Sequence, residues 1–337
     1  MNDNVYIIGE VGPNHNGNIN IAMMMVEQMA ATGINAIKFQ CSDPYLLYSD
    51  DSFKASYQKE NDKAESAREM SLSFQLSLED HVELYNRCKQ LDVDYMCTAF
   101  DYDSLLYLNE HTDMAYFKVA SGEIFSVDIL EYMAKAHKPI ILSTGMATYE
   151  EVKLSISILT KYEPKEIIVL HCISNYPAAY EEVNLRNILE LAERFGYQVG
   201  FSDHTIGNEC AIAAVAMGAR MIEKHVTFDK NAPGPDHKAS IDIKELGQLV
   251  SSIRHVECAL GTKQRVFSDS QLEIAQVARK SIVTKYKMEK GHIITAEDIC
   301  YKRPGTGFLP IHADLVLGKA LAVDKKADRV IYPMDLI

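Results

Sequence analysis

Two histidines, His204 and His225, each close a short apolar run of this 337-residue chain. If those two runs are neighbouring parallel strands, the side chains lie about 4.8 Å apart. Two imidazoles at that spacing can share one divalent ion and leave positions open for water and substrate. Buried histidines also serve purely structural roles, so the spacing alone leaves both a metal site and a structural pair open.

Two lysines, Lys38 and Lys118, end further apolar runs and bring positive charge to the same set of run ends. Hydroxyl groups occupy the corresponding ends of other runs, at Ser121, Ser143, Ser174 and Ser202. Ammonium groups with hydroxyl donors suit a phosphate or carboxylate better than a neutral sugar. Two alternatives stay open, a lysine that forms a Schiff base with the substrate and an internal salt bridge with Glu10 or Glu123.

Other polar residues lie where they can join such a site. Glu10 ends the first run and can act as a further metal ligand or as a base. In the segment NAPGPDHKAS (231–240), Pro-Gly-Pro stiffens a loop that presents Asp236 and His237. Such a loop can also be a simple connection without a role in a site. Arg303 lies in the turn KRPGTGF, which is weak support for a site when taken alone.

The elements that carry these residues follow a regular order. Eight apolar, β-rich runs cover 5–10, 34–40, 93–100, 115–121, 138–144, 166–174, 197–204 and 219–226. Segments of helical period lie between and after them, for example at 21–32, 78–91, 150–162, 208–218 and 244–260. Eight such units in about 260 residues predict a (β/α)8 barrel, with its active site at the carboxyl ends of the strands. A doubly wound open sheet is the alternative, but it usually has fewer strands.

Two regions depart from this alternation. Residues 41–77 form a polar connection too long for a plain loop, and we expect it to act as a lid or a substrate wall. From about residue 262 the alternation stops. We therefore expect a barrel domain at 1–262, a polar linker at 263–280 and a small β-rich domain at 281–337.

Composition narrows the class of partner. The chain has 34 Lys and Arg against 47 Asp and Glu, a net charge of −13, which argues against binding nucleic acid or a membrane surface. An anionic substrate must then be held by cations gathered locally. Seven cysteines without a CxxC pair or metal spacing indicate reduced thiols. With neither a signal peptide nor a long apolar stretch, the chain is expected to be cytoplasmic.

Several motifs occur in order along the chain. They are EVGPNHNG, IKFQ, KVASGE, ILSTGM, NYP, GFSDHTIG, IEKHVTFDKNAPGPDHKAS and, in the tail, YKRPGTGF. Together they resemble the sialic acid synthase family, the phosphoenolpyruvate-dependent synthases of nonulosonic acids. The resemblance implies a (β/α)8 TIM barrel followed by an antifreeze-like SAF domain. It also implies a domain-swapped homodimer in which the partner's SAF domain caps each active site.

The resemblance assigns roles to individual positions. His204 and His225 match divalent-metal ligands, with Mn2+ as the expected ion and Mg2+ or Co2+ as alternatives. Glu10 matches a catalytic carboxylate, and Glu10 or Glu123 would move protons. Phosphoenolpyruvate contacts are implied at Lys38, Lys118, Ser121, Ser143 and Ser202, and also at Ser174, where some members carry Asn. Sugar contacts are implied at Gln40, Glu123, Tyr176 and Asp236, and at Arg303, which the partner would deliver.

The activity implied by the resemblance is a condensation. Phosphoenolpyruvate, an N-acylated mannosamine-type sugar and water would give a nonulosonic acid and phosphate, through C–O cleavage and a metal-polarised aldehyde. N-acetylmannosamine is the first expectation for the sugar. A 2,4-diacetamido-trideoxy hexose, giving legionaminate or pseudaminate, is the alternative. A Schiff-base aldolase acting through Lys118 and a carbohydrate- or ice-binding protein are more distant alternatives.

Overall fold

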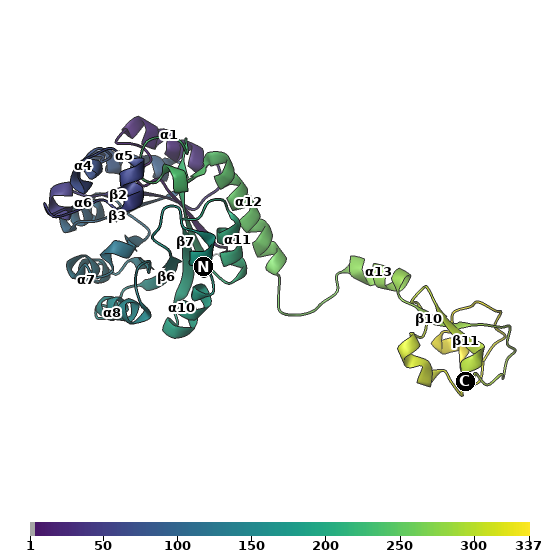
Figure 1. The fold of residues 1–337 in the computed structure, drawn as a ribbon. Helices are drawn as coiled ribbons and strands as arrows, with labels where there is room; N and C mark the ends of the chain where they lie inside the picture. The colour runs from purple at the N-terminus through teal and green to yellow at the C-terminus, as the bar shows by residue number, and fades with distance from the viewer. Residues whose placement is uncertain (1–3) are drawn as a thin grey trace. The chain divides into compact units, whose positions relative to one another are not determined.

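The structure, a computed structural model, describes residues 4–337 and divides into two compact units. The first unit extends to Gly261, and the second comprises Thr262–Ile337 (Figure 1). Each unit has a hydrophobic cluster of its own. No helix within the described residues combines the length and the apolar character needed to cross a membrane.

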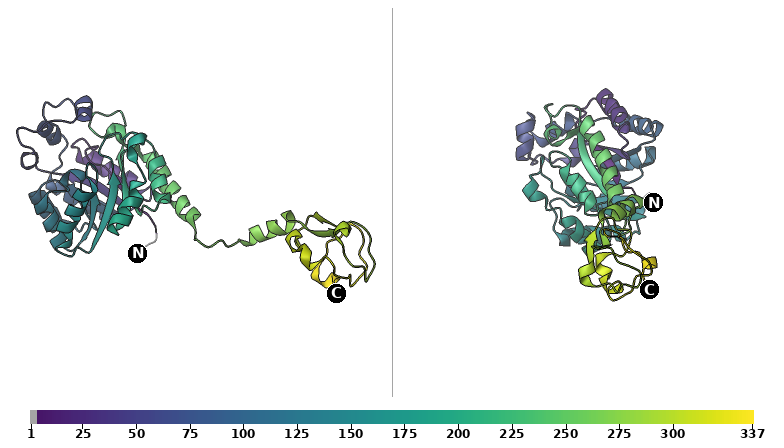
Figure 2. Two further views of the ribbon diagram at one scale, coloured as in Figure 1. Left: turned by 60° about the horizontal axis from the view of Figure 1, so that its bottom comes forward. Right: turned by 90° about the vertical axis from the view of Figure 1, so that its right-hand side faces the viewer.

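The first unit is built on eight parallel strands, with helices outside them in every view (Figures 1 and 2). The strands are β1 (Tyr6–Glu10), β2 (Ala36–Cys41), β3 (Asp94–Ala99), β4 (Phe117–Val119), β5 (Pro139–Ser143), β6 (Glu166–Cys172), β7 (Gln198–Asp203) and β8 (Met221–Thr227). Their order is β3-β2-β1-β8-β7-β6-β5-β4, and the two-residue strand β9 (Ile241–Asp242) pairs in parallel with the end of β8. β3 and β4 contact each other and bring the sheet close to a closed ring. The predicted (β/α)8 barrel is therefore confirmed.

Helices follow the strands as the helical periods predict. They are α1 (Ile19–Ala30), α5 (Leu78–Gln90), α6 (Tyr102–His111), α7 (Val127–Lys135), α8 (Tyr149–Thr160), α9 (Tyr180–Val183), α10 (Asn187–Phe195), α11 (Glu209–Ala216) and α12 (Ile243–Leu260). Local sequence fixes several starts. At α5, for example, the Ser77 side chain accepts from the Asp80 amide while Asp80 accepts from the Ser77 amide. This reciprocal cap satisfies two backbone donors that the first helical turn leaves unpaired.

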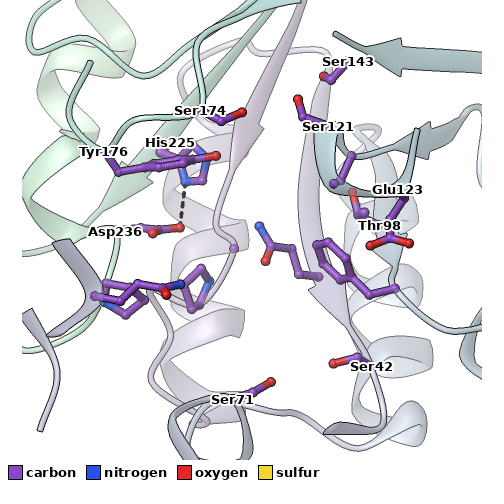
Figure 3. Close-up of a pocket in the computed structure, with 18 of the residues that line it drawn as sticks. Ser42, Ser71, Thr98, Ser121, Glu123, Ser143, Ser174, Tyr176, His225 and Asp236 are labelled. Carbon is purple, nitrogen blue, oxygen red and sulfur yellow. Dashed lines mark ion pairs between the residues drawn. The ribbon is translucent and has the colours of Figure 1, made fainter. Parts of the chain in front are cut away.

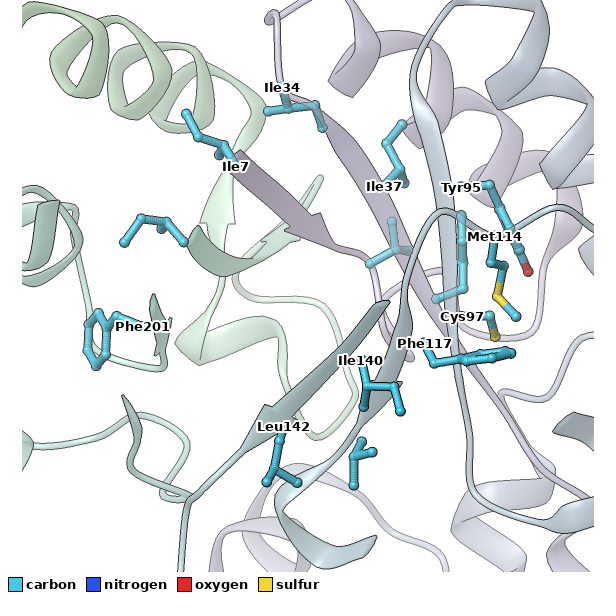
Figure 4. Close-up of a cluster of buried hydrophobic side chains, with 14 of the residues drawn as sticks. Ile7, Ile34, Ile37, Tyr95, Cys97, Met114, Phe117, Ile140, Leu142 and Phe201 are labelled. Carbon is cyan, nitrogen blue, oxygen red and sulfur yellow. The ribbon is translucent and has the colours of Figure 1, made fainter. Parts of the chain in front are cut away.

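The core has two layers because strand residues alternate between the two faces of the sheet. Side chains such as Ile7, Phe117 and Phe201 point outward and pack under the helices (Figure 4). The side chains of the alternate strand residues point to the other face and fill the barrel interior, among them Met96 and Leu170. Both layers are closed to solvent, which leaves the strand ends as the place where polar side chains can gather.

The connection between β2 and α5 is more ordered than its polar sequence indicates. It contains the short helices α2 (Pro44–Leu47), α3 (Ser56–Asn61) and α4 (Ala67–Leu72). Lys54 is buried within it and donates to the Asp62 carboxylate at 2.9 Å, the Asp62 carbonyl at 2.8 Å and the Ala64 carbonyl at 3.0 Å. One ammonium thus ties together a segment that has little apolar core of its own.

The second unit is small and rich in turns. β10 (Ser281–Thr284) pairs antiparallel with β11 (Ile299–Lys302) around a cluster that includes Ile282, Leu321 and Ile331. Residues 263–280, expected to be a polar linker, include the helix α13 (Asp269–Ala278), which Ser268 caps. The Gln276 carbonyl accepts from the Gly305 amide at 2.6 Å, so α13 is attached to this unit.

Candidate active site at the mouth of the barrel

A cavity of about 490 Å³ opens at the carboxyl ends of the strands. Strand ends form its floor, and the connection between β2 and α5 forms part of its wall (Figure 3). The predicted site residues that line it are Lys38, Gln40, Lys118, Ser121, Glu123, Ser143, Ser174, Tyr176, Ser202, His204, His225 and Asp236. Glu10 lies just behind them and contacts Lys38 and Gln40. Arg303 belongs to the second unit, where it is exposed after β11, and its role stays a prediction.

The two histidines come from β8 and from the residue that follows β7, and their ring centroids are 5.2 Å apart. His204 Nδ1 lies 2.7 Å from the Ile173 carbonyl, which favours a proton on Nδ1 and makes Nε2 the atom that a metal would bind. Burial, together with nearby His204, lowers the pKa of His225 well below its usual range, so this ring is neutral. His204 differs, because burial acts in the same direction but Cys172 and the Ile173 carbonyl outweigh it and raise the pKa of His204 to about 9. A divalent ion bound beside His225 would therefore displace a proton from His204.

A carboxylate completes this corner of the cavity. His225 Nδ1 is buried without a hydrogen-bond partner in the described part of the chain, and Asp236 Oδ2 lies 3.5 Å from it (Figure 3). An unpaired buried nitrogen is costly unless a ligand satisfies it. The residues present therefore fit a divalent ion, with Asp236 close enough to contribute.

Lys38 lies among buried carboxylates. Its Nζ is 2.6 Å from Glu10 Oε2, 3.7 Å from Glu223 Oε2 and 3.2 Å from Thr98 Oγ1. Of the alternatives left open by the sequence, the internal salt bridge is thus present at Lys38, with Glu10 and not Glu123 as its partner. The Glu123 carboxylate instead accepts from Ser126.

Lys118 has a different environment. Its Nζ donates to Ser143 Oγ at 2.8 Å and to the Val119 carbonyl at 3.1 Å, and no carboxylate of the described residues forms an ion pair with it. Burial lowers the pKa of Lys118. Glu223 is the opposite charge that acts most strongly on Lys118, but the two groups do not form an ion pair. A buried ammonium without a direct ion-pair partner favours binding of an anion.

Three serines and a backbone amide surround the same end of the cavity. The Gly145 amide donates to Ser121 Oγ at 3.0 Å. A Cβ atom at Gly145 would lie 2.7 Å from that oxygen and 2.3 Å from Ser174 Oγ, so only glycine leaves both hydroxyls in place. Figure 3 shows Ser121, Ser143 and Ser174 around this end. Together with Lys118 they form a cradle of donors for an anion.

Two buried carboxylates differ sharply in proton affinity. Burial raises the pKa of Glu10 to about 7, although the ion pair with Lys38 opposes this shift. Burial acts in the same direction on Glu223, but Lys118 and Lys38 outweigh it and lower the pKa of Glu223 to about 2. Glu10 can therefore exchange a proton near neutral pH while Glu223 stays ionised.

Aromatic and apolar side chains make the outer wall. The Tyr176 ring lies 4.1 Å from the His204 ring and 5.5 Å from the ring of Tyr57 on α3. Leu47 and Met70, from the same connection, also line the cavity. The outer wall is thus less polar than the floor, which suits the body of an organic substrate.

Glu223, Thr98 and Tyr57 belong to the site, although the sequence prediction did not assign them. Glu223 could have been found from alternation, since it lies two residues before His225 and shares its face of β8. Thr98 lies opposite Gln40 in the β2–β3 register, two residues beyond the partner of Lys38, so it lies on the same face of the sheet as Lys38. Tyr57 lies in a segment without strand or helix periodicity, so nothing in the sequence alone pointed to it.

Comparisons with known proteins agree with this geometry. The sequence matches the NeuB family over residues 25–265 and the SAF domain over residues 279–337. The N,N'-diacetyllegionaminic acid synthase of Legionella pneumophila is 39% identical over 327 residues, covering 96% of this chain and 92% of the relative. The human N-acetylneuraminate-9-phosphate synthase is 30% identical over 328 residues, covering 97% and 91%.

Solved structures give the same result. A crystal structure of an N-acetylneuraminic acid synthetase from Leptospira borgpetersenii, in complex with citrate, superposes with a TM-score of 0.73 at 32% identity. The match covers 81% of this chain and 90% of that chain. Fold and relatives together define an enzyme, a transferase of the synthase type (EC 2.5.1.-). The chain belongs to the NeuB family of sialic acid synthases and carries a C-terminal SAF domain.

Proposed function

We propose that this enzyme condenses phosphoenolpyruvate with an N-acylated amino sugar and water to give a nonulosonic acid and phosphate. The observation that carries the proposal is the joint placement of two different groups in one cavity. The donor cradle around Lys118 suits an anionic substrate, and the histidine pair with Asp236 suits a metal. An aldolase that forms a Schiff base would need the lysine and its anion site but no metal site.

His204 and His225 would hold a divalent ion, with Mn2+ as the expected ion and Mg2+ or Co2+ as alternatives. The unpaired Nδ1 of His225 and the nearby Asp236 carboxylate support this assignment. When bound, the ion supplies Lewis-acid polarisation of a substrate carbonyl.

The chain's own residues account for the remaining steps. Lys118, the serines and Lys38 would hold the phosphate and carboxylate of phosphoenolpyruvate while its C3 forms a bond to the aldehyde carbon. Positive charge then develops at C2, where water adds. The tetrahedral product loses phosphate by cleavage of the C2–O bond. Glu10, with a pKa of about 7, can take the proton of the water, and the ionised Glu223 balances the charge of the lysines.

The sugar that best fits the cavity wall is a 2,4-diacetamido-trideoxy hexose, which would give a legionaminic acid. Leu47, Met70 and Phe74 offer apolar contact to a methyl group at C6, and the Legionella relative is named for this product. Among the described residues that line the cavity, Lys38 and Lys118 supply all the lysine and arginine, so a 6-phosphate would lack a partner. N-acetylmannosamine remains the second candidate because the Leptospira structure, at 32% identity, is that of a sialic acid synthetase.

Arg303 would act in trans in this proposal. In a domain-swapped homodimer, the SAF domain of one protomer would place Arg303 against the acetamido group of the sugar bound by its partner. The exposure of Arg303 after β11 leaves its guanidinium available for such a contact.

A substrate panel tests the activity. Phosphate release from phosphoenolpyruvate is measured with N-acetylmannosamine, with its 6-phosphate and with the diacetamido sugar, before and after chelation and readdition of Mn2+. We expect release to be fastest with the diacetamido sugar and to fall to background with chelator. Trapping of a pyruvate adduct by borohydride, or the absence of phosphate release with every sugar, would contradict the proposal.

A further inference from the structure

A second group of metal-ligating side chains lies on the outer face of the barrel wall. Cys41 on β2, Cys97 on β3 and His81 on α5 are all buried, and one ligand atom from each lies within 4.8 Å of the other two. Cys97 Sγ is 4.0 Å from His81 Nδ1. The three residues are spread over 57 positions of sequence without a recognisable spacing, so only the fold brings them together.

The surroundings of this cluster favour a ligand over a purely apolar contact. His81 is fully buried, and its Nε2 has no hydrogen-bond partner in the part of the chain that the structure describes. Its Nδ1 lies 2.9 Å from the Tyr95 hydroxyl. The nitrogen that faces Cys97 is Nδ1, so an ion bound there would replace or share the contact of Nδ1 with Tyr95. A fully buried imidazole and two buried thiols that converge in this way are an unusual arrangement for an apolar core.

Charge and ligand type indicate which ion would fit. Two thiolates carry a charge of −2 and a neutral imidazole carries none, so a divalent ion bound to them gives a complex with no net charge, which can be buried. Thiolate sulfur is a soft ligand, and Zn2+ binds Cys and His in a tetrahedral arrangement with ligand atoms about 3.5–3.8 Å apart. Contraction of about 1 Å from the present spacing would be enough, with the Tyr95 hydroxyl or a water in the fourth position.

We propose that Cys41, Cys97 and His81 form a binding site for a thiophilic divalent ion such as Zn2+. This site is separate from the histidine pair in the cavity. The donor sets keep the two sites chemically distinct. The cavity site offers imidazole and carboxylate, whereas this site is dominated by thiolate.

The site is placed where it can hold functional residues in position. Cys41 follows Gln40, which donates to Glu10, and Cys97 precedes Thr98, which accepts from Lys38. An ion that joins β2, β3 and α5 would fix the ends of both strands behind the cavity floor. Cys41 also belongs to the lining of the cavity, so the two sites share one strand end.

Cobalt absorption tests the site without relying on activity. The untagged full chain, reduced and stripped with chelator, is titrated anaerobically with Co2+, and thiolate-to-cobalt charge-transfer bands are followed in the near ultraviolet. We expect the bands to saturate at one equivalent and to vanish when Zn2+ displaces Co2+. Zn2+ should also raise the thermal midpoint of the first unit.

Cys41→Ser and Cys97→Ser should each remove the charge-transfer bands, and should reduce the thermal shift to the part that ion binding at the histidine pair contributes, with zinc affinity at the cysteine site reduced at least about 10-fold. Cys258→Ser, which changes an exposed cysteine of α12, is the matched control and should keep both. Circular dichroism establishes that each variant is folded, and His81→Gln serves as a further variant if a cysteine variant is not. Absence of the bands in the wild-type chain, or their persistence in Cys41→Ser and Cys97→Ser, would overturn the proposal.

Discussion

At the scale of single residues, the two lysines in the cavity have different electrostatic environments. Lys38 is neutralised by Glu10 and lies near Glu223, whereas Lys118 has only a hydroxyl and a carbonyl as partners. The buried positive charge of Lys118 is therefore the one that an incoming anion would compensate. Both lysines line the cavity, but the charge of Lys38 is already balanced within the floor, whereas that of Lys118 is less directly compensated.

The first prediction concerns Lys118. Replacement Lys118→Met keeps the length of the side chain but removes the charge, and we expect the KM for phosphoenolpyruvate to rise roughly 10- to 100-fold. Lys153→Met, at an exposed position on α8, is the control and should change this KM by less than about twofold. Equal effects of the two substitutions on phosphate-release kinetics would contradict the role given to Lys118.

The second prediction concerns Gly145. In Gly145→Ala the added methyl group would meet Ser174 Oγ at 2.3 Å and Ser121 Oγ at 2.7 Å, displacing two donors of the cradle. We expect weaker inhibition by inorganic phosphate and a raised KM for phosphoenolpyruvate, with about the same thermal stability. Gly247→Ala on α12, where the nearest atom would lie 4.0 Å away, is the control. Unchanged phosphate inhibition in Gly145→Ala would show that the cradle does not bind the anion.

At the scale of elements, the Lys54 ammonium group is one of the main polar contacts within the connection between β2 and α5. Lys54→Met would leave the part-buried Asp62 and Ala64 acceptors without their donor, and we expect a loss of stability of about 1–3 kcal/mol in total because solvent can partly replace the ammonium. We expect faster proteolysis within residues 50–70 and a raised KM for the sugar. Lys59→Met, at an exposed position of α3, is the control. A KM that rises for phosphoenolpyruvate but not for the sugar would refute this division of roles.

The elements also show how far sequence reasoning reaches. The strands and main helices of the barrel were predictable because apolar periodicity is local, and the strand ends followed because parallel strands share one edge. The connection was predicted as a wall, but its helices were not, since a buried lysine and not an apolar stripe holds them. Cys41, His81 and Cys97 could not be associated because the β2–β3 register and the packing of α5 are set by tertiary contacts.

At the scale of the whole molecule, a mixing experiment tests whether Arg303 acts in trans. At phosphoenolpyruvate concentrations below the wild-type KM, Lys118→Met and Arg303→Ala chains are each expected to have low activity. If the partner supplies Arg303, re-associated mixed dimers contain one site with both residues intact, and random mixing restores about a quarter of wild-type activity. Activity that stays at the level of the separate variants would place Arg303 in its own protomer's site or outside catalysis.

The ring of strands has one weak place. Every neighbouring pair from β3 through β1 and β8 to β4 is joined by backbone hydrogen bonds, but within the described strands no ladder joins β3 to β4. β4 has only three residues, and it carries Lys118. Amide protons along this seam should exchange with solvent deuterium faster than those between β1 and β8, and substrate should slow them. Faster exchange at the seam would mean that the barrel opens there, and slower exchange with substrate would mean that an anion bound at Lys118 holds β3 and β4 together.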